Sequence, residues 1–154
     1  MIQRIDQIHL EVAESYARLS KAKKLKVGAL IVKDNRVISI GYNGTPSGWD
    51  NTCEEEVSET ENCILDSGPN FPITTIELVT KPEVIHAEAN AIAKLARSNE
   101  SGLDSTMYIT HSPCFECAKL IYTAGIRKVY FRQHYRNEDG IKFLKKCNIE
   151  VEKL

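Results

Sequence analysis

Two cysteines stand three positions apart in the segment Pro113-Cys114-Phe115-Glu116-Cys117. On a helix this spacing puts both sulfur atoms on one face. A helix that starts directly after Pro113 also places them in its first turn, where free backbone N–H groups and the helix dipole favour thiolates. A pair of thiolates favours zinc among the common metals. Taken alone, however, the pair indicates a redox dithiol equally well.

The segment His86-Ala87-Glu88 opens an alanine-rich stretch 28 residues before Cys114. One imidazole and two thiolates leave a tetrahedral zinc with one open position for water, which is the catalytic arrangement. Glu88 lies two residues from His86, so it points around the helix and can handle the protons of that water. The combined H-x-E…P-C-x-x-C pattern is typical of zinc-dependent base deaminases. We therefore predict His86, Cys114 and Cys117 as zinc ligands and Glu88 as the catalytic proton carrier.

The whole chain has the composition of an ordinary globular domain, with 154 residues, 42% hydrophobic and 27% charged. It contains no apolar run long enough to span a membrane, and its charged N-terminus lacks a signal core, so a cytoplasmic protein is expected. The five cysteines are an odd number, which argues against a disulfide framework. A net charge of −1 argues against a nucleic-acid partner. The lysines between positions 21 and 26 are interpreted as a solvated helix end.

Hydrophobic periodicity predicts one α/β domain over residues 1–154. Helices are expected at 4–20, 86–97, 114–124 and 138–147, and strands at 27–32, 37–40, 105–110, 128–132 and 149–151. Alternating strands and helices in the second half imply parallel pairing, while the opening hairpin makes the sheet mixed. Residues 50–82 show weak periodicity and are predicted to be an irregular insertion with at most a short strand at 75–79.

With these residues in place, the chain resembles the deoxycytidylate (dCMP) deaminases of the cytidine deaminase-like superfamily. The resemblance covers about Val27 to Tyr135 and rests on VGALIV, GYNGTPSG, IHAEANAI and STMYITHSPCFECAKLIYTAGIRKVYF. It implies a three-layer α/β/α sandwich around a five-stranded mixed sheet. It also implies a homohexamer that converts dCMP to dUMP, the precursor of dTMP, with release of ammonia.

The resemblance also implies roles for residues outside the metal motif. Asn43 matches an asparagine near the deoxyribose and Tyr135 a tyrosine that contacts substrate. Thr45, in the glycine-rich loop 41–48, is a candidate phosphate contact, because such a loop lets backbone N–H groups approach an anion. Backbone groups near Ala87 are candidates for binding the base.

Family members are typically activated by dCTP with magnesium and inhibited by dTTP, so these effectors are expected here. The candidate allosteric residues are Gly28, Tyr42, Gly44 and Arg97. Some members bind a second, structural zinc through the insertion and the end of the first helix. That helix end lacks a cysteine here, and only Cys53 and Cys63 remain in the insertion, which argues against a second zinc.

Two alternatives stay open at this point. A tRNA-type adenosine deaminase shares the metal motif, but it is expected to carry a basic surface, whereas here the net charge is −1 and Glu116 lies inside the C-x-x-C. A zinc-stabilised binding module without turnover needs a fourth protein ligand. Only three ligands fit the motif, which argues against such a module. His111 lies close to Cys114 in sequence and is interpreted as a structural histidine.

Overall fold

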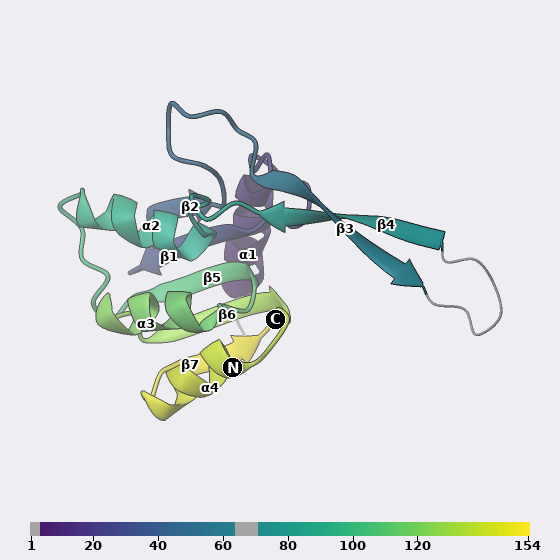
Figure 1. The fold of residues 1–154 in the computed structure, drawn as a ribbon. Coiled ribbons are helices and arrows are strands. Elements are labelled where there is room, and N and C mark those ends of the chain that lie inside the picture. Colours follow the sequence, from purple (N-terminus) through teal and green to yellow (C-terminus); the bar gives the residue numbers. More distant parts are fainter. Residues whose placement is uncertain (1–3, 64–70) are drawn as a thin grey trace.

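A five-stranded mixed sheet forms the centre of the molecule in the computed structural model, which describes residues 4–63 and 71–154 (Figure 1). Its strand order is β2-β1-β5-β6-β7. The strands are β1 (Gly28–Lys33), β2 (Arg36–Tyr42), β5 (Thr106–His111), β6 (Lys128–Gln133) and β7 (Glu150–Lys153). β1 runs antiparallel to β2 and β5, whereas β5, β6 and β7 are parallel. The predicted five-stranded mixed sheet is confirmed.

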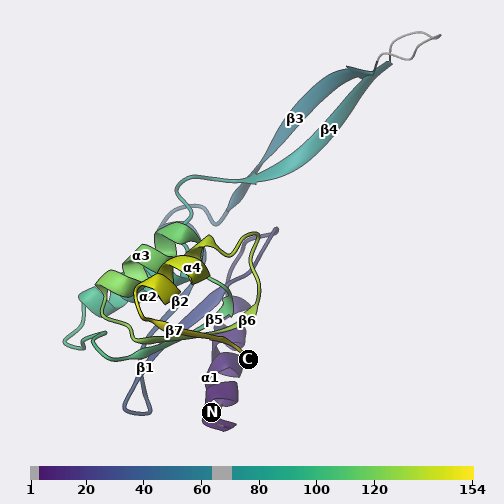
Figure 2. The ribbon, with the colours of Figure 1, turned by 90° about the horizontal axis from the view of Figure 1, so that it is seen from below.

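Four helices cover the two faces of this sheet. They are α1 (Arg4–Ala17), α2 (Ala87–Ala96), α3 (Phe115–Thr123) and α4 (Asp139–Lys146). α1 lies on one face, and α2, α3 and α4 lie on the other (Figures 1 and 2). The predicted three-layer α/β/α sandwich is therefore confirmed. In the described part of the chain, no helix has the length and apolar character needed to cross a bilayer.

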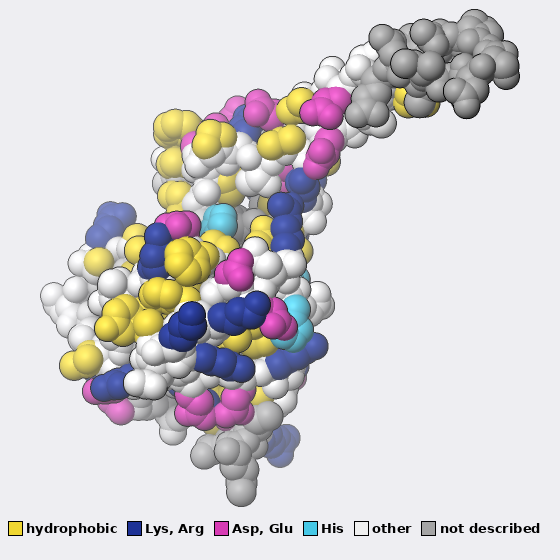
Figure 3. All heavy atoms as spheres, turned by 60° about the horizontal axis from the view of Figure 1, so that its bottom comes forward, with side chains coloured by type: hydrophobic (Ala, Val, Ile, Leu, Met, Phe, Trp, Pro, Cys, Tyr) yellow, Lys and Arg dark blue, Asp and Glu magenta, His cyan; other side chains and the backbone are white. Residues whose placement is uncertain are grey.

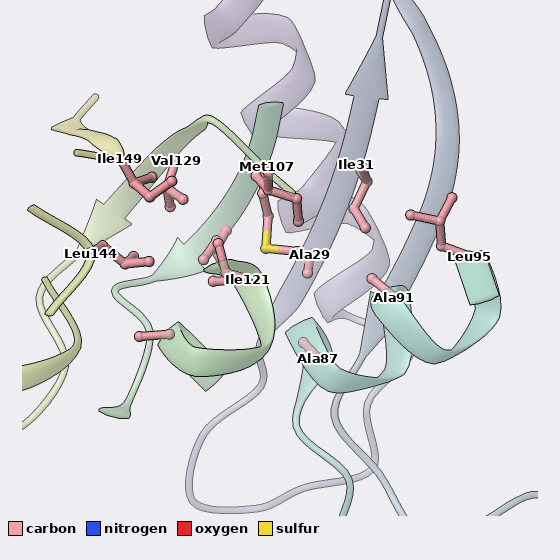
Figure 4. Close-up of a cluster of buried hydrophobic side chains, with 13 residues drawn as sticks. Ala29, Ile31, Ala87, Ala91, Leu95, Met107, Ile121, Val129, Leu144 and Ile149 are labelled. Carbon is pink, nitrogen blue, oxygen red and sulfur yellow. The ribbon is translucent and has the colours of Figure 1, made fainter. Parts of the chain in front are cut away.

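Strand β1 shows how the core divides between the two faces. Ala29 and Ile31 pack with α2 and α3 in one buried cluster (Figure 4), while Leu30 and Val32 pack with α1 in another. Successive side chains of a strand point to opposite faces, so a strand covered on both sides must be apolar at every position. This is why the run VGALIV, predicted only as a strand of a hairpin, has apolar residues at successive positions.

The segment predicted to be an irregular insertion is instead a long antiparallel hairpin. Strands β3 (Glu54–Cys63) and β4 (Phe71–Thr80) pair without a break from Glu54↔Thr80 to Cys63↔Phe71, and they project from the body (Figures 1 and 2). The prediction was wrong because glutamates and threonines occupy both faces, which removes the alternation that marks a half-buried strand. The short strand expected at 75–79 lies within β4. Residues 64–70 lie outside the described residues.

Two glycines allow the helices that carry the metal motif to sit close to their neighbours. A Cβ added at Gly41 in β2 would overlap the carbonyl oxygen of Ala87, and one added at Gly140 in α4 would overlap that of Pro113. Close backbone contact of this kind needs a residue without a side chain. The starts of α2 and α3 are thereby held against the sheet and against α4.

Candidate active site and metal centre

The predicted metal ligands come from the starts of α2 and α3, which meet at one end of the sheet. His86 and Cys114 are the residues immediately before these helices, and both have extended backbone, with φ −67° and ψ 154° at His86 and φ −68° and ψ 169° at Cys114. Cys117 lies in the first turn of α3, where its N–H donates to the Cys114 Sγ at 3.5 Å. The Cys114 sulfur thus satisfies one of the free N–H groups of the helix start.

The three ligand atoms are spaced as a tetrahedral zinc ion requires. The Nδ1 atom of His86 lies 3.4 Å from the Sγ of Cys117 and 3.6 Å from the Sγ of Cys114, and all three atoms lie within 4.8 Å of one another. Zinc bonds of about 2.3 Å to sulfur and 2.0–2.1 Å to nitrogen separate two such ligands by about 3.6 Å at the tetrahedral angle. No other residue of the described chain joins this group, so the donor set is that of a site with an open fourth position.

The two thiol groups share one proton, which biases Cys114, but not Cys117, towards the ionised form that binds metal. The pKa of Cys114 is lowered mainly because the Cys117 thiol donates a hydrogen bond to it, with further contributions from His86. The pKa of Cys117 is raised because it keeps the proton shared with Cys114 and because it is buried. The same contact with Cys114 raises the pKa of His86. A divalent cation relieves this competition by taking the place of the shared proton.

Glu88 lies beside the ligands, in the first turn of α2, and is only 4% exposed. Burial raises its pKa to about 7, because a carboxylate loses its hydration in the interior. A carboxyl group with a pKa near neutrality can both accept and return a proton.

A cavity of 390 Å³ opens in front of the metal ligands, a size usual for small-molecule sites. It brings together residues from the loop after α1, the root of the hairpin, the start of α2 and the ends of β5 and β6. Of the residues predicted from sequence, it is lined by Asn43, His86, Ala87, Glu88, Cys114 and Tyr135. His111 also lines the cavity, but its Nδ1 lies 3.1 Å from the Thr110 Oγ1, and it is not part of the ligand group.

Asn43 is held in the cavity wall by hydrogen bonds from its side chain to backbone, and Tyr135 by a hydrogen bond from its backbone to a side chain. The Asn43 amide accepts from the Val27 N–H and donates to the Leu25 carbonyl, both at 2.8 Å. The Tyr135 N–H donates to the hydroxyl of buried Ser112 at 2.8 Å. The Asn43 side chain and the Tyr135 backbone are therefore held in place by the protein's own hydrogen bonds.

The remaining predicted residues lie away from the cavity lining. The hydroxyl of Thr45 donates to the Asp50 carbonyl at 2.7 Å, so it closes its own loop. Gly28 is buried, and a Cβ there would overlap the Ala13 carbonyl of α1. Arg97 is an exposed residue at the end of α2.

Tyr42 and Gly44 are linked to the start of α2. The Asn90 side chain donates to the Tyr42 carbonyl at 2.9 Å. Gly44 pairs with Ile85, the residue before His86, through two backbone hydrogen bonds of 2.8 and 3.1 Å. The glycine-rich loop thus contacts the helix that carries His86 and Glu88.

Sequence reasoning missed three charged residues that line the cavity, namely Lys24, Glu54 and Arg136. Lys24 belongs to the lysines that the sequence indicates as a solvated helix end, and Glu54 lies in the segment predicted to be an irregular insertion. Neither has a local signal, because each reaches the cavity only through the tertiary arrangement. Arg136 directly follows Tyr135, and that neighbour was the one available clue.

Cys53 and Cys63 cannot share a metal ion within one chain. They stand at opposite ends of β3, and a strand rises about 3.3 Å per residue, so their backbones are about 30 Å apart. Cys53 is buried in an apolar cluster with Ala22 and Val84. The side chain of Cys63 lies outside the described residues.

Comparison with known proteins gives the same picture as the site. Residues 3–133 match the family model for the cytidine and deoxycytidylate deaminase zinc-binding region. The deoxycytidylate deaminase of Enterobacteria phage T4 is 35% identical over 92% of this chain and 86% of that protein. Human deoxycytidylate deaminase is 38% identical over 79% of this chain and 61% of that protein.

A solved structure is similar over nearly the full length. The crystal structure of dCMP deaminase from the cyanophage S-TIM5, in complex with dCMP and dUMP, has a TM-score of 0.81 and 39% identity, and the match covers 100% of this chain and 99% of that one. The matched region includes His86, Cys114 and Cys117, which form the zinc-binding site. The chain therefore belongs to the zinc-binding family of cytidine and deoxycytidylate deaminases, on its deoxycytidylate deaminase branch.

Proposed function

We propose that this chain catalyses the hydrolytic deamination of dCMP to dUMP and ammonia, and so supplies dUMP for dTMP synthesis. The observation that carries the proposal is the position of Glu88, a buried carboxyl group beside a three-ligand zinc site that opens onto a nucleotide-sized cavity. The similarity to a dCMP deaminase solved with dCMP and dUMP supports the choice of substrate.

Zinc, when bound, supplies a Lewis acid that lowers the pKa of water towards roughly 7. Glu88 accepts a proton from the attacking water and delivers it to the ring nitrogen next to the carbon under attack. It then carries the second proton of that water to the exocyclic amine. The carbon–nitrogen bond breaks, ammonia leaves, and a carbonyl group remains on the ring.

The walls of the cavity suit a nucleotide with a 5′-phosphate. Both Asn43 and Tyr135 line the cavity, with the Asn43 side chain and the Tyr135 backbone held by hydrogen bonds to neighbouring residues. Lys24 and Arg136 add two positive side chains to the lining. Cations of this kind bind phosphate through charge-assisted hydrogen bonds. We therefore assign phosphate recognition to Lys24 and Arg136 rather than to Thr45, whose hydroxyl is engaged by Asp50.

A substrate panel tests the proposal. The purified protein, loaded with zinc, is assayed for loss of the cytosine chromophore with dCMP, deoxycytidine, CMP and dCTP, and for ammonia release from a structured tRNA. We expect dCMP to be turned over with a far higher kcat/KM than deoxycytidine, because binding energy from the phosphate positions the ring. Equal kcat/KM values for dCMP and deoxycytidine would contradict a nucleotide-specific site.

The same panel decides between the proposal and its alternatives. Turnover of tRNA but not of dCMP would favour a tRNA-type adenosine deaminase. No turnover of any substrate, with zinc fully bound, would favour a non-catalytic zinc module.

We further propose that the enzyme is a homohexamer. α3 exposes the apolar side chains Phe115, Leu120 and Tyr122, and the hairpin exposes Val57, Ile73, Ile76 and Val79. Figure 3 shows hydrophobic and positively charged side chains side by side on one face of the body, with the hairpin extending beyond it. A two-stranded hairpin is at best marginally stable by itself in water, so contact with another chain accounts for its exposed apolar groups.

We also propose control by dCTP with magnesium as activator and by dTTP as inhibitor. The hydrogen bonds from Asn90 to Tyr42 and between Gly44 and Ile85 support this, because a ligand on the loop would act on the start of α2. Gly28 contributes by allowing α1 to approach β1, and Arg97 offers a cation at the far end of α2. Rates against dCMP concentration are measured with and without each effector, in the presence of magnesium. We expect shifts of about 5–150-fold in apparent affinity, the usual range of allosteric coupling, and superimposable curves would contradict the proposal.

A further inference from the structure

Glu54 is an acidic residue at the root of the hairpin, yet it is only 6% exposed. Its Oε1 atom accepts hydrogen bonds from the backbone N–H groups of Lys23 and Lys24, at 2.9 and 3.1 Å. A buried carboxylate is costly unless hydrogen bonds replace its hydration, and two backbone donors provide that compensation. Glu54 is therefore a tie between the hairpin and the loop that follows α1.

The residue tied by Glu54 faces the cavity. Lys24 lines the cavity, as do Glu54 and its strand partner Thr80. The Lys24 ammonium also lies 3.8 Å from the Oε1 of Glu77 on β4. The hairpin thus contacts Lys24 in two places. The buried Glu54 carboxylate accepts a hydrogen bond from the Lys24 backbone N–H, and Glu77 forms a looser, partly exposed ion pair with the Lys24 side chain.

The buried tie has a larger effect than the ion pair. An exposed pair at 3.8 Å contributes little, whereas hydrogen bonds from backbone N–H groups to a buried carboxylate are strong and directional. The loop after α1 belongs to no helix or strand at Lys23 and Lys24, so few other backbone contacts hold it. The position of Lys24 at the cavity therefore depends on Glu54.

We infer that Glu54 is a positioning residue for nucleotide recognition, which holds the Lys23–Lys24 backbone so that the Lys24 ammonium faces the phosphate of the substrate. The inference rests on the proposed function for the identity of the substrate. This inference gives the hairpin a role in the active site, because Glu54 and Thr80, the first residue pair of the hairpin, form part of the cavity wall.

Steady-state kinetics of the zinc-loaded enzyme test this role with Glu54→Ala, Glu54→Gln and the matched control Glu56→Ala. Glu56 is the next residue on the same face of β3 and is exposed. We expect Glu54→Ala to raise KM for dCMP about tenfold, as the loss of hydrogen bonds to a charged group implies, with little change in kcat. Glu54→Gln keeps an acceptor oxygen and restores most of the affinity, and Glu56→Ala behaves as the unaltered protein.

Two comparisons separate positioning from general loss of structure. The kcat/KM for deoxycytidine, which lacks the phosphate, is expected to fall much less than the kcat/KM for dCMP in Glu54→Ala. In a Lys24→Ala background, Glu54→Ala is expected to change KM for dCMP by less than about twofold, because residues that act as a unit are not additive. Equal losses for dCMP and deoxycytidine, or a full tenfold effect in the Lys24→Ala background, would overturn the inference.

Two further measurements keep the test decisive. If Glu54→Ala does not fold, Glu54→Asp replaces it, because it keeps the charge but withdraws the carboxylate by one methylene group. If the unaltered protein does not act on dCMP, the proposed function fails, and amide hydrogen exchange of Lys23 and Lys24 then decides the positioning separately. Faster exchange in Glu54→Ala than in Glu56→Ala supports the tie, and unchanged exchange overturns it.

Discussion

Glu88 shows how one buried side chain acquires its chemical role from its surroundings. It is held in the first turn of α2, close to His86 and Cys117, where it is almost fully buried at the wall of the cavity. Burial raises its pKa to about 7, and the nearby His86 opposes that rise only in part. The same glutamate on an exposed helix start would merely be a favourable N-terminal charge.

The first prediction concerns Glu88→Gln. The amide has nearly the same shape but cannot accept and return a proton, so we expect turnover of dCMP to fall by about 10²–10⁴-fold. Zinc content, measured by elemental analysis, and the melting temperature are expected to stay close to those of the unaltered protein, since Glu88 is outside the ligand group. Retention of more than about a tenth of the activity would contradict a general acid–base role.

A second prediction at this scale concerns Cys117→Ala. Cys117→Ala removes one of the three zinc ligands, so zinc binds more weakly. Because the free energy of zinc binding stabilises the folded state, the protein also loses stability. We expect zinc to be lost and stability to fall by about 3 kcal/mol or more, the effect of a ligand present at some hundredfold its Kd. Thermal melting and metal analysis check this.

Cys147→Ala is the matched control for that experiment. Cys147 is a half-buried cysteine at the end of α4, outside the ligand group. The Cys147→Ala variant is expected to keep zinc fully bound. One zinc per chain in Cys117→Ala, at unaltered affinity, would show that Cys117 is not a ligand.

At the scale of the elements, the starts of two helices do most of the positioning. The ligands His86 and Cys114, at the starts of α2 and α3, are 28 residues apart in sequence, yet the ligand atoms of this group lie within 4.8 Å of one another. Their placement depends on close contacts at Gly41 and Gly140. A small displacement of either helix separates the ligands, since the tetrahedral geometry tolerates little change.

The third prediction therefore concerns Gly41→Ala. The added methyl group meets the Ala87 carbonyl and pushes α2 away from β2. We expect a loss of about 1–3 kcal/mol in the free energy of unfolding, as for other overpacked sites, and weaker zinc binding, measured by competition with a chelator. Gly44→Ala is the control for stability, because no atom lies within 4 Å of a Cβ there. Equal melting temperatures for the two variants would contradict the packing argument.

At the scale of the whole molecule, the hairpin is the feature that a single chain leaves unexplained. It extends from a well-packed body (Figure 2) and exposes apolar side chains, of which Ile76 is the most exposed at 69%. Its root takes part in the cavity through Glu54 and Thr80. A second chain that packs against the hairpin would therefore also influence the geometry of the active site.

The fourth prediction tests the proposed homohexamer. Light scattering is expected to give a hexamer for the unaltered protein. Ile76→Glu places a charge in a contact meant for an apolar group, so we expect the dissociation constant of the assembly to rise about tenfold or more, as at other interface hot spots. Leu103→Glu changes another exposed apolar residue, 55% exposed and on the loop before β5, and serves as the control. Assembly that is unaffected by Ile76→Glu would exclude the hairpin from the interface.

The sequence by itself determined the metal ligands, the sheet and the layers, and it placed Glu88 beside the ligands. His86, Glu88, Cys114 and Cys117 lie at fixed offsets from helix starts, and local spacing on a helix dictates which side chains share a face. The core strands and helices were equally predictable, because burial on one or both faces imposes a periodicity on the apolar residues.

Only the tertiary structure decided the hairpin and the far wall of the cavity. Polar residues lie on both faces of β3, and the apolar residues of β4 do not alternate regularly with polar ones, so no period-two pattern in the sequence marks the pairing of these two strands. Lys24 and Glu54 are 30 residues apart and meet through a hydrogen bond to backbone N–H, a group that every residue except proline carries. The type of the donating residue therefore does not predict this hydrogen bond. Only the folded structure shows it.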